Sequence, residues 1–142
     1  MINNCKAFFL FLSFCSIAIL ACDQDDDVSP NSNDPQAVSS VLASDNEWII
    51  TLFTDDGENE TYYFESYRFN FDLDGSVVAT GNNDIVTGTY SVFRDDGRVE
   101  LKMSFPNIQY FDELNDDWYF ISMDQNVVRF DDDGDRLEFQ KQ

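Results

Sequence analysis

The chain has 142 residues, 28 acidic and 8 basic, with a net charge of -20. A chain this acidic is repelled by phosphate backbones, which excludes nucleic-acid binding through a basic patch. It contains no histidine, which excludes Ser-His-Asp and Cys-His catalysis and histidine-ligated zinc. Because 43% of its residues are hydrophobic, it is too apolar to be disordered, and its length predicts one ordinary domain plus a short extra segment.

The N-terminus carries the pattern of an export signal. Lys6 is the only charged residue before a largely apolar run over residues 7–20, which is shorter than the roughly 20 residues of a membrane span. The run ends in Ile19-Leu20-Ala21-Cys22 and an acidic stretch follows at once. This pattern resembles a bacterial lipoprotein signal, in which the cysteine is lipidated and becomes N-terminal after cleavage. We predict a cleaved signal peptide over residues 1–21 and attachment of acyl chains such as palmitate at Cys22. An ordinary signal peptide is the alternative.

The predicted lipid anchor also indicates a location. Cys5 and Cys15 lie inside the signal, so the mature chain keeps a single cysteine and cannot form an internal disulfide. Long acyl chains contribute ~0.8 kcal/mol per buried methylene, and two or three of them anchor a protein essentially permanently. The acidic run after Cys22 resembles the export signal of surface-displayed lipoproteins in Bacteroidetes-type bacteria. We therefore predict a protein anchored in the outer membrane and exposed at the cell surface, with the periplasmic face as the alternative.

A tether and a helix are predicted next. Residues 22–34 are mostly polar and cannot bury enough surface to fold, so they form a predicted tether that leads to a domain over residues 35–142. Asp34-Pro35 has the pattern of a helix start, with Asp as the N-cap and Pro at the first helical position. Apolar residues then follow at helical spacing: Val38, Val41 and Leu42. We expect this helix to plug one end of the domain.

From residue 47 onward, apolar and polar residues alternate with the period of a half-buried strand. Eight strands are predicted over residues 48–53, 67–73, 76–81, 85–93, 99–105, 118–123, 126–130 and 136–140. Four of the six glycines follow Asp, a favoured tight-turn signal, and strands joined by short turns are antiparallel neighbours. We predict an all-β fold, an antiparallel eight-stranded up-and-down barrel with one or two short helices; a β-sandwich is the alternative.

The one long connection, residues 106–117, has apolar residues spaced by three: Ile108, Phe111 and Leu114. This spacing predicts one or two helical turns that cover an open end of the barrel.

Several segments together resemble a known class of domain. Trp48 opens the first strand, and Phe69-Asn70-Phe71-Asp72-Leu73-Asp74-Gly75, Gly88-Thr89-Tyr90 and Asp135-Arg136-Leu137-Glu138-Phe139 follow. They resemble the small lipocalin-like domains of Bacteroidetes lipoproteins over roughly residues 46–142. Typical lipocalins carry Gly where this chain has Asn46, and the domain is shorter than a ligand-carrying lipocalin. The resemblance therefore implies a barrel more strongly than a transported ligand, and it identifies no functional residue.

Aromatic residues are abundant in the predicted barrel, where ten Phe, six Tyr and two Trp follow Asp34. The interior of an eight-stranded barrel is either filled by side chains or holds one small ligand. We expect a filled interior; the alternative is an apolar pocket lined by Trp48, Phe69, Phe71, Tyr90, Trp118 and Phe120.

Two acidic segments raise the question of metal binding or acid–base chemistry. Calcium could bind where carboxylates crowd one turn, at Asp131, Asp133 and Asp135, but a solvated hairpin is the favoured interpretation. Glu113 with Asp116 or Asp117 beside Trp118 has the composition of a glycosidase pair, yet close carboxylates are common in so acidic a chain. We therefore expect no cofactor and no enzymatic activity.

The predicted function is that of a lipid-anchored, non-enzymatic envelope lipoprotein. Its barrel is expected to bind a small hydrophobic molecule, a glycan or a partner protein. The alternative is a structural or interaction subunit of an envelope assembly, with a solid barrel core and no ligand pocket.

Overall fold

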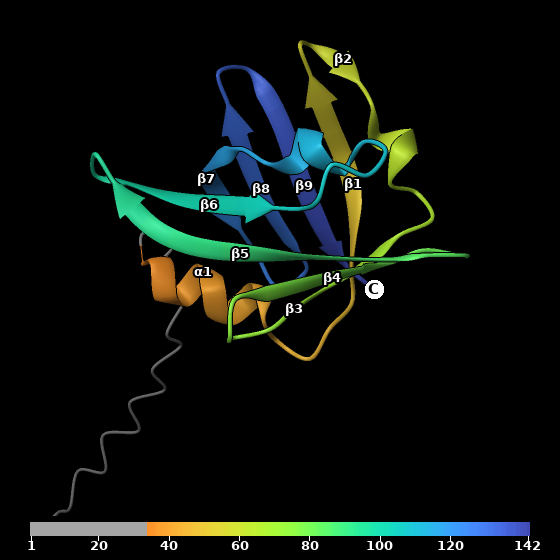
Figure 1. Ribbon diagram of the computed structural model, residues 1–142. Coiled ribbons are helices and arrows are strands. Elements are labelled where there is room, and N and C mark those ends of the chain that lie inside the picture. Colours follow the sequence, from red (N-terminus) through yellow and green to blue (C-terminus); the bar gives the residue numbers. More distant parts are fainter. Residues whose placement is uncertain (1–33) are drawn as a thin grey trace, which may run out of the picture.

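A computed structural model describes residues 34–142, which fold into a β-barrel and a short helix (Figure 1). The predicted signal peptide, the lipid-attachment residue Cys22 and nearly all of the predicted tether lie outside the described residues. The elements run in chain order α1 (Pro35–Leu42), β1 (Trp48–Asp55), β2 (Glu58–Asn59), η1 (Thr61–Tyr63), β3 (Arg68–Phe71), β4 (Ser76–Thr80), β5 (Ile85–Asp95), β6 (Arg98–Ser104), η2 (Phe111–Leu114), β7 (Asp117–Met123), β8 (Val127–Asp132) and β9 (Asp135–Lys141). Both η elements are short 3-10 helices.

The sheet closes on itself, which confirms the predicted eight-stranded up-and-down barrel. From β3 to β9 each strand pairs antiparallel with the next one in sequence, and β9 returns to pair with β1. The pairing of β1 with β3 is confined to Trp48 and Phe69. The two-residue β2 is added at the end of β1 through a tight hairpin. Closure through β1 and β9 pairs the first strand with the last, and the sheet is interrupted only between β1 and β3, which share a single residue pair.

Three of the four Asp-Gly pairs form the predicted two-residue turns. Asp56, Asp96 and Asp133 adopt φ values of 50°, 43° and 43°, and the glycine after each is also left-handed. Two consecutive positive φ values define the hairpin turn whose twist matches that of the flanking strands. The fourth pair lies in a longer turn between β3 and β4, in which only Gly75 has a positive φ.

Helix α1 begins as the sequence predicts and closes one end of the barrel. The Asp34 carboxylate accepts a hydrogen bond from the Gln36 backbone N–H at 3.0 Å, which satisfies one of the free donors of the first turn. Val38 and Leu42 are fully buried in the core. The Trp48 indole Nε1 donates to the Leu42 carbonyl at 2.9 Å, so the end of the helix is tied to the start of β1.

The other end of the barrel is formed by loops. Strand β1 runs from α1 towards η1. Strands β9 and β8 lie between β1 and β7 in the sheet, and each neighbouring pair is antiparallel, so β7 runs in the opposite direction to β1. Strand β7 begins just after η2. The β1–β2 and β8–β9 turns therefore lie at the same end as η1 and η2, away from α1 (Figure 1). We call this the loop end.

Two apolar residues depart from the predicted pattern. Leu73 continues the alternation of β3, but the strand ends at Phe71 and Leu73 is 74% exposed in the following turn. Ile108 was expected to cover the barrel, yet it is 45% exposed because the helical turn begins only at Phe111. Phe111 and Leu114 are buried as expected.

Candidate functional site

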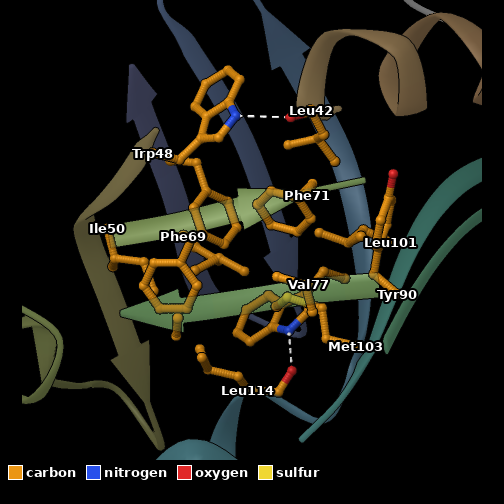
Figure 2. Packing of buried hydrophobic residues seen from close by; sticks show 14 of the residues in the cluster. Leu42, Trp48, Ile50, Phe69, Phe71, Val77, Tyr90, Leu101, Met103 and Leu114 are labelled. Carbon is orange, nitrogen blue, oxygen red and sulfur yellow. Dashed lines mark hydrogen bonds between the residues drawn. The ribbon is translucent and has the colours of Figure 1, made fainter. Parts of the chain in front are cut away.

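The interior of the barrel is occupied by aromatic side chains from opposite walls. The rings of Phe53 on β1 and Trp118 on β7 are 6.0 Å apart, although two other strands separate β1 from β7 in the sheet. The ring of Phe139 on β9 lies 5.6 Å from that of Phe69 and 5.3 Å from that of Phe71, both on β3. These rings meet inside the barrel, and Figure 2 shows Phe69 and Phe71 among the packed core side chains.

The six predicted pocket-lining residues pack within or against this cluster. Trp48, Phe69, Phe71, Tyr90 and Trp118 are buried core residues, and half-buried Phe120 packs beside them. The two indoles are further held by hydrogen bonds, from Trp48 to the Leu42 carbonyl and from Trp118 to the Leu114 carbonyl. Figure 2 shows the bond between Trp48 and Leu42 beside the packed side chains, and a second dashed line that ends at Leu114. Among these six, Phe71 and Tyr90 contact each other with ring centroids 5.0 Å apart, and Trp118 and Phe120 contact other core rings, those of Phe53 and Phe130.

A group of carboxylates gathers at the loop end instead. Asp55 ends β1, Glu60 precedes η1 and Glu113 lies in η2. One oxygen from each of these three carboxylates lies within 4.8 Å of the others. Oxygens of Glu60 and Glu113 (Oε2 in both) are shielded from solvent, and no donor reaches them other than a proton that the two carboxyl groups can share. The three side chains come from segments far apart in sequence, so only the closed barrel brings them together.

The crowding changes the acid–base behaviour of the carboxylates. The pKa of Glu113 is raised to about 7, first by burial, then by a hydrogen bond with Glu60 and by repulsion from Glu60 and Asp55. Two carboxyl groups in contact make such a bond only when one of them holds a proton. Burial and neighbouring carboxylates also raise the pKa of Asp55. The group therefore keeps a proton near neutral pH.

A second acidic pair extends this group towards the β8–β9 turn. The pKa of Asp132 is raised to about 6, first by burial and then by repulsion from and a hydrogen bond with Asp116. Asp116 also raises the pKa of Asp55, so its charge acts on both the Asp55 group and Asp132. We call Asp55, Glu60, Glu113, Asp116 and Asp132 the acidic rim.

The three residues considered for calcium have other contacts. Asp131 on β8 lies 3.7 Å from the guanidinium of Arg98. Both carboxylate oxygens of Asp135 accept backbone N–H bonds, from Asp56 and from Gly57. Asp133 lies in the turn itself and is exposed. Asp135 thus ties the β8–β9 turn to the β1–β2 turn, while the carboxylates that converge lie in the acidic rim.

Three tyrosines stack beside the acidic rim. The rings of Tyr62 and Tyr63 are 4.2 Å apart, and Tyr63 lies almost parallel to Tyr110 at 3.3 Å. Tyr62 is 57% and Tyr110 40% exposed. The backbone joins them to the rim, because the Tyr63 N–H donates to the Glu60 carbonyl and the Glu113 N–H to the Tyr110 carbonyl. We call these residues the tyrosine stack.

Glu113 and Asp116 were predicted from the sequence as members of an acidic pair. The other residues of the acidic rim and the tyrosine stack were not predicted. Glu60 and the tyrosine stack lie in connections that carry no strand pattern. The available signal was the adjacent pair Tyr62-Tyr63 in a polar connection, since exposed aromatics in loops are more informative than those in strands. Asp117, the other predicted partner of Glu113, instead pairs with Lys102 at 2.9 Å.

A cleft of about 390 Å³ lies between the α1–β1 connection and the β3–β4 hairpin. Its lining is largely polar and includes Asn46, Asn70 and Asp72, with Phe71 as the one predicted pocket residue that reaches it. The cleft is open to solvent and lies outside the barrel interior.

The fold has a counterpart among solved structures. A DUF4847 family protein from Bacteroides vulgatus superimposes with a TM-score of 0.51 at 19% sequence identity, over 72% of this chain and 96% of that one. This similarity supports a small barrel fold of a kind found in Bacteroides. No family model matches the chain, and no curated protein matches it in sequence. Within residues 34–142, α1 and the two η elements are too short to cross a bilayer as helices.

Proposed function

We propose that this protein is a lipid-anchored, non-enzymatic envelope protein that recognises a partner through the outside of a solid barrel. The observation that carries the proposal is the contrast between the two regions of the barrel. Aromatic rings from strands that are not neighbours meet in the interior, whereas the loop end exposes a tyrosine stack close in the chain to carboxylates that lack protein donors. The interior thus supports stability and the loop end supports recognition.

The proposed anchor is Cys22, which follows the apolar run and the small residue Ala21. Lipidation there would place the barrel at the outer membrane, at the end of the acidic tether, with the cell surface as the favoured side. The charge of -20 would repel the barrel from anionic surfaces and keep it in solvent. Palmitate labelling of the protein in its host tests this part. We expect label in the native chain and none in Cys22→Ala; label retained in the variant would refute the anchor.

Native mass spectrometry of the protein purified from its host tests the solid barrel. We expect the mass of the lipidated chain alone, because side chains already occupy the interior. A stoichiometric apolar molecule that is released only on unfolding would show that the barrel is a carrier, and would refute recognition by the outside surface as the principal function.

A further inference from the structure

The loop end also indicates what kind of partner it fits. We infer that the tyrosine stack and the adjoining carboxylates form a docking surface for a basic protein segment that presents arginine side chains. This inference rests on the proposed function, since it supplies the partner that a solid barrel would recognise.

The first argument is the exposure of three contiguous rings. Tyr62, Tyr63 and Tyr110 come from two different connections; Tyr63 stacks on Tyr110 and contacts the tilted ring of Tyr62, yet the outer two remain well exposed. Tyrosine is enriched at protein interfaces because a large ring contacts a partner at little cost in conformational entropy. Phe64, which follows Tyr63, is buried against Phe53 and Phe111. The stack therefore stands on a rigid base.

The second argument is charge. Glu60 lies just before Tyr62 and Tyr63 in the chain and Glu113 just after Tyr110, with backbone hydrogen bonds between them, and both carboxylates come together with Asp55. Among the described residues, Lys102 pairs with Asp117, and Arg129 pairs with Asp124 and Glu138, so neither cation pairs with the acidic rim. The acidic rim is left with carboxylates facing carboxylates, an arrangement that a cation from outside would relieve. Negative potential over an aromatic surface favours a positively charged partner.

The third argument is that the chain already contains the proposed contact within itself. The guanidinium of Arg98 lies 3.6 Å above the ring of Tyr119, and the same guanidinium faces the Asp131 carboxylate. An arginine between a tyrosine face and a carboxylate combines a cation–π contact with a charged pair. The tyrosine stack and Glu60 offer the same surroundings to an arginine from a second protein.

The test uses the full chain in neutral detergent and a dye-labelled peptide of alternating arginine and glycine, with fluorescence anisotropy as the readout. We expect Tyr62→Ser/Tyr110→Ser to weaken binding about tenfold, equivalent to about 1.4 kcal/mol. We also expect Glu60→Gln/Glu113→Gln to weaken it. The control, Glu47→Gln/Asp96→Asn, removes two exposed carboxylates outside the loop end, at least as much charge as the rim variant removes from a group that keeps a proton, and should bind like the native chain. Circular dichroism checks that each variant is folded.

Equal losses in the rim variant and its control would show attraction by overall charge only and would overturn the inference. Unchanged binding by the tyrosine variant would overturn it as well. An uncharged oligosaccharide serves as the second probe, followed by amide chemical shifts. Shifts at residues 60–63 and 110–113 with the sugar but not with the peptide would make the partner a glycan. That result would refute the basic segment while leaving recognition by the outside surface in place.

Discussion

Replacing Glu113 with glutamine should stabilise the protein in a way that depends on pH. The folded barrel raises the pKa of this carboxyl from 4.5 to about 7, so the folded state resists its ionisation. Below about pH 4.5 the group is protonated in both the folded and the unfolded chain and costs nothing. Between about pH 4.5 and pH 7 the unfolded chain ionises this carboxyl while the folded chain keeps its proton, so stability falls over this interval; above about pH 7 the folded chain also ionises it, beside Glu60 and Asp55, and the loss is complete. Glu113→Gln stays neutral at every pH and can donate an amide N–H to Glu60.

The size of the effect follows from the pKa. The interval from 4.5 to about 7 corresponds to at most about 3.4 kcal/mol, at about 1.36 kcal/mol per pH unit. Glu113 is only partly buried, and solvent screening reduces such an interaction, so we expect about 1–2 kcal/mol. For a domain of about 100 residues this raises the melting temperature by roughly 4–10 °C. The gain should be present at pH 8 and nearly absent at pH 4.

Thermal unfolding followed by circular dichroism at both pH values measures the effect. Glu58→Gln is the matched control, because Glu58 is exposed in the short strand β2 and its replacement removes the same charge. We expect the control to shift the melting temperature by much less at pH 8. A gain of equal size at pH 4 and pH 8, or no gain at pH 8, would refute the carboxyl contact as its cause.

Three further outcomes are expected. Phe69→Ala should lower the free energy of unfolding by about 3–5 kcal/mol, because Phe69 is fully buried against rings from several walls; denaturant titration measures this, and a loss below 1 kcal/mol would indicate an interior with free space. Trp48→Phe should cost about 1–3 kcal/mol by leaving the Leu42 carbonyl without its donor, and amide exchange should show faster opening of α1 than in the native chain. Adding a calcium chelator should leave the melting temperature unchanged, since Asp135 in the β8–β9 turn is already held by backbone donors; a clear drop would place a structural ion there.

The fold was largely predictable because its signals are local. The cap at Asp34 depends on residues within one turn of helix, and the alternation that defines each strand is read over a few residues. Asp-Gly turns then require that consecutive strands pair antiparallel. With eight such strands, closure of the sheet into a barrel was the favoured architecture. The predicted strand bounds were wrong where a turn competes with the alternation of apolar and polar residues. Leu73 fits the alternation of β3, but the turn needed before Ser76 takes precedence.

The candidate site was less predictable because it depends on which loops meet. Glu60 and Glu113 are separated by most of the barrel in sequence, and nothing near either residue specifies the other. The stacking of Tyr63 on Tyr110 likewise joins two loops that are far apart in the sequence. Local composition identified Glu113 as a member of an acidic pair, but its observed neighbours come from η1 and β1 rather than from its own segment. Long-range contacts of this kind appear only after the barrel has closed.

The joint between β1 and β9 has a consequence for how the protein matures. The first and the last strands of the barrel are partners, with Trp48 opposite Lys141 and Phe53 opposite Leu137. While the final strand is still missing, Ile50 and Phe53 lack the neighbours that β9 supplies, and the β1 backbone remains unpaired along most of its length. The barrel therefore cannot be completed during synthesis or during passage through a narrow channel. The barrel can close only after all seven residues of β9 have emerged. Any protein that binds the growing chain before then binds an open sheet.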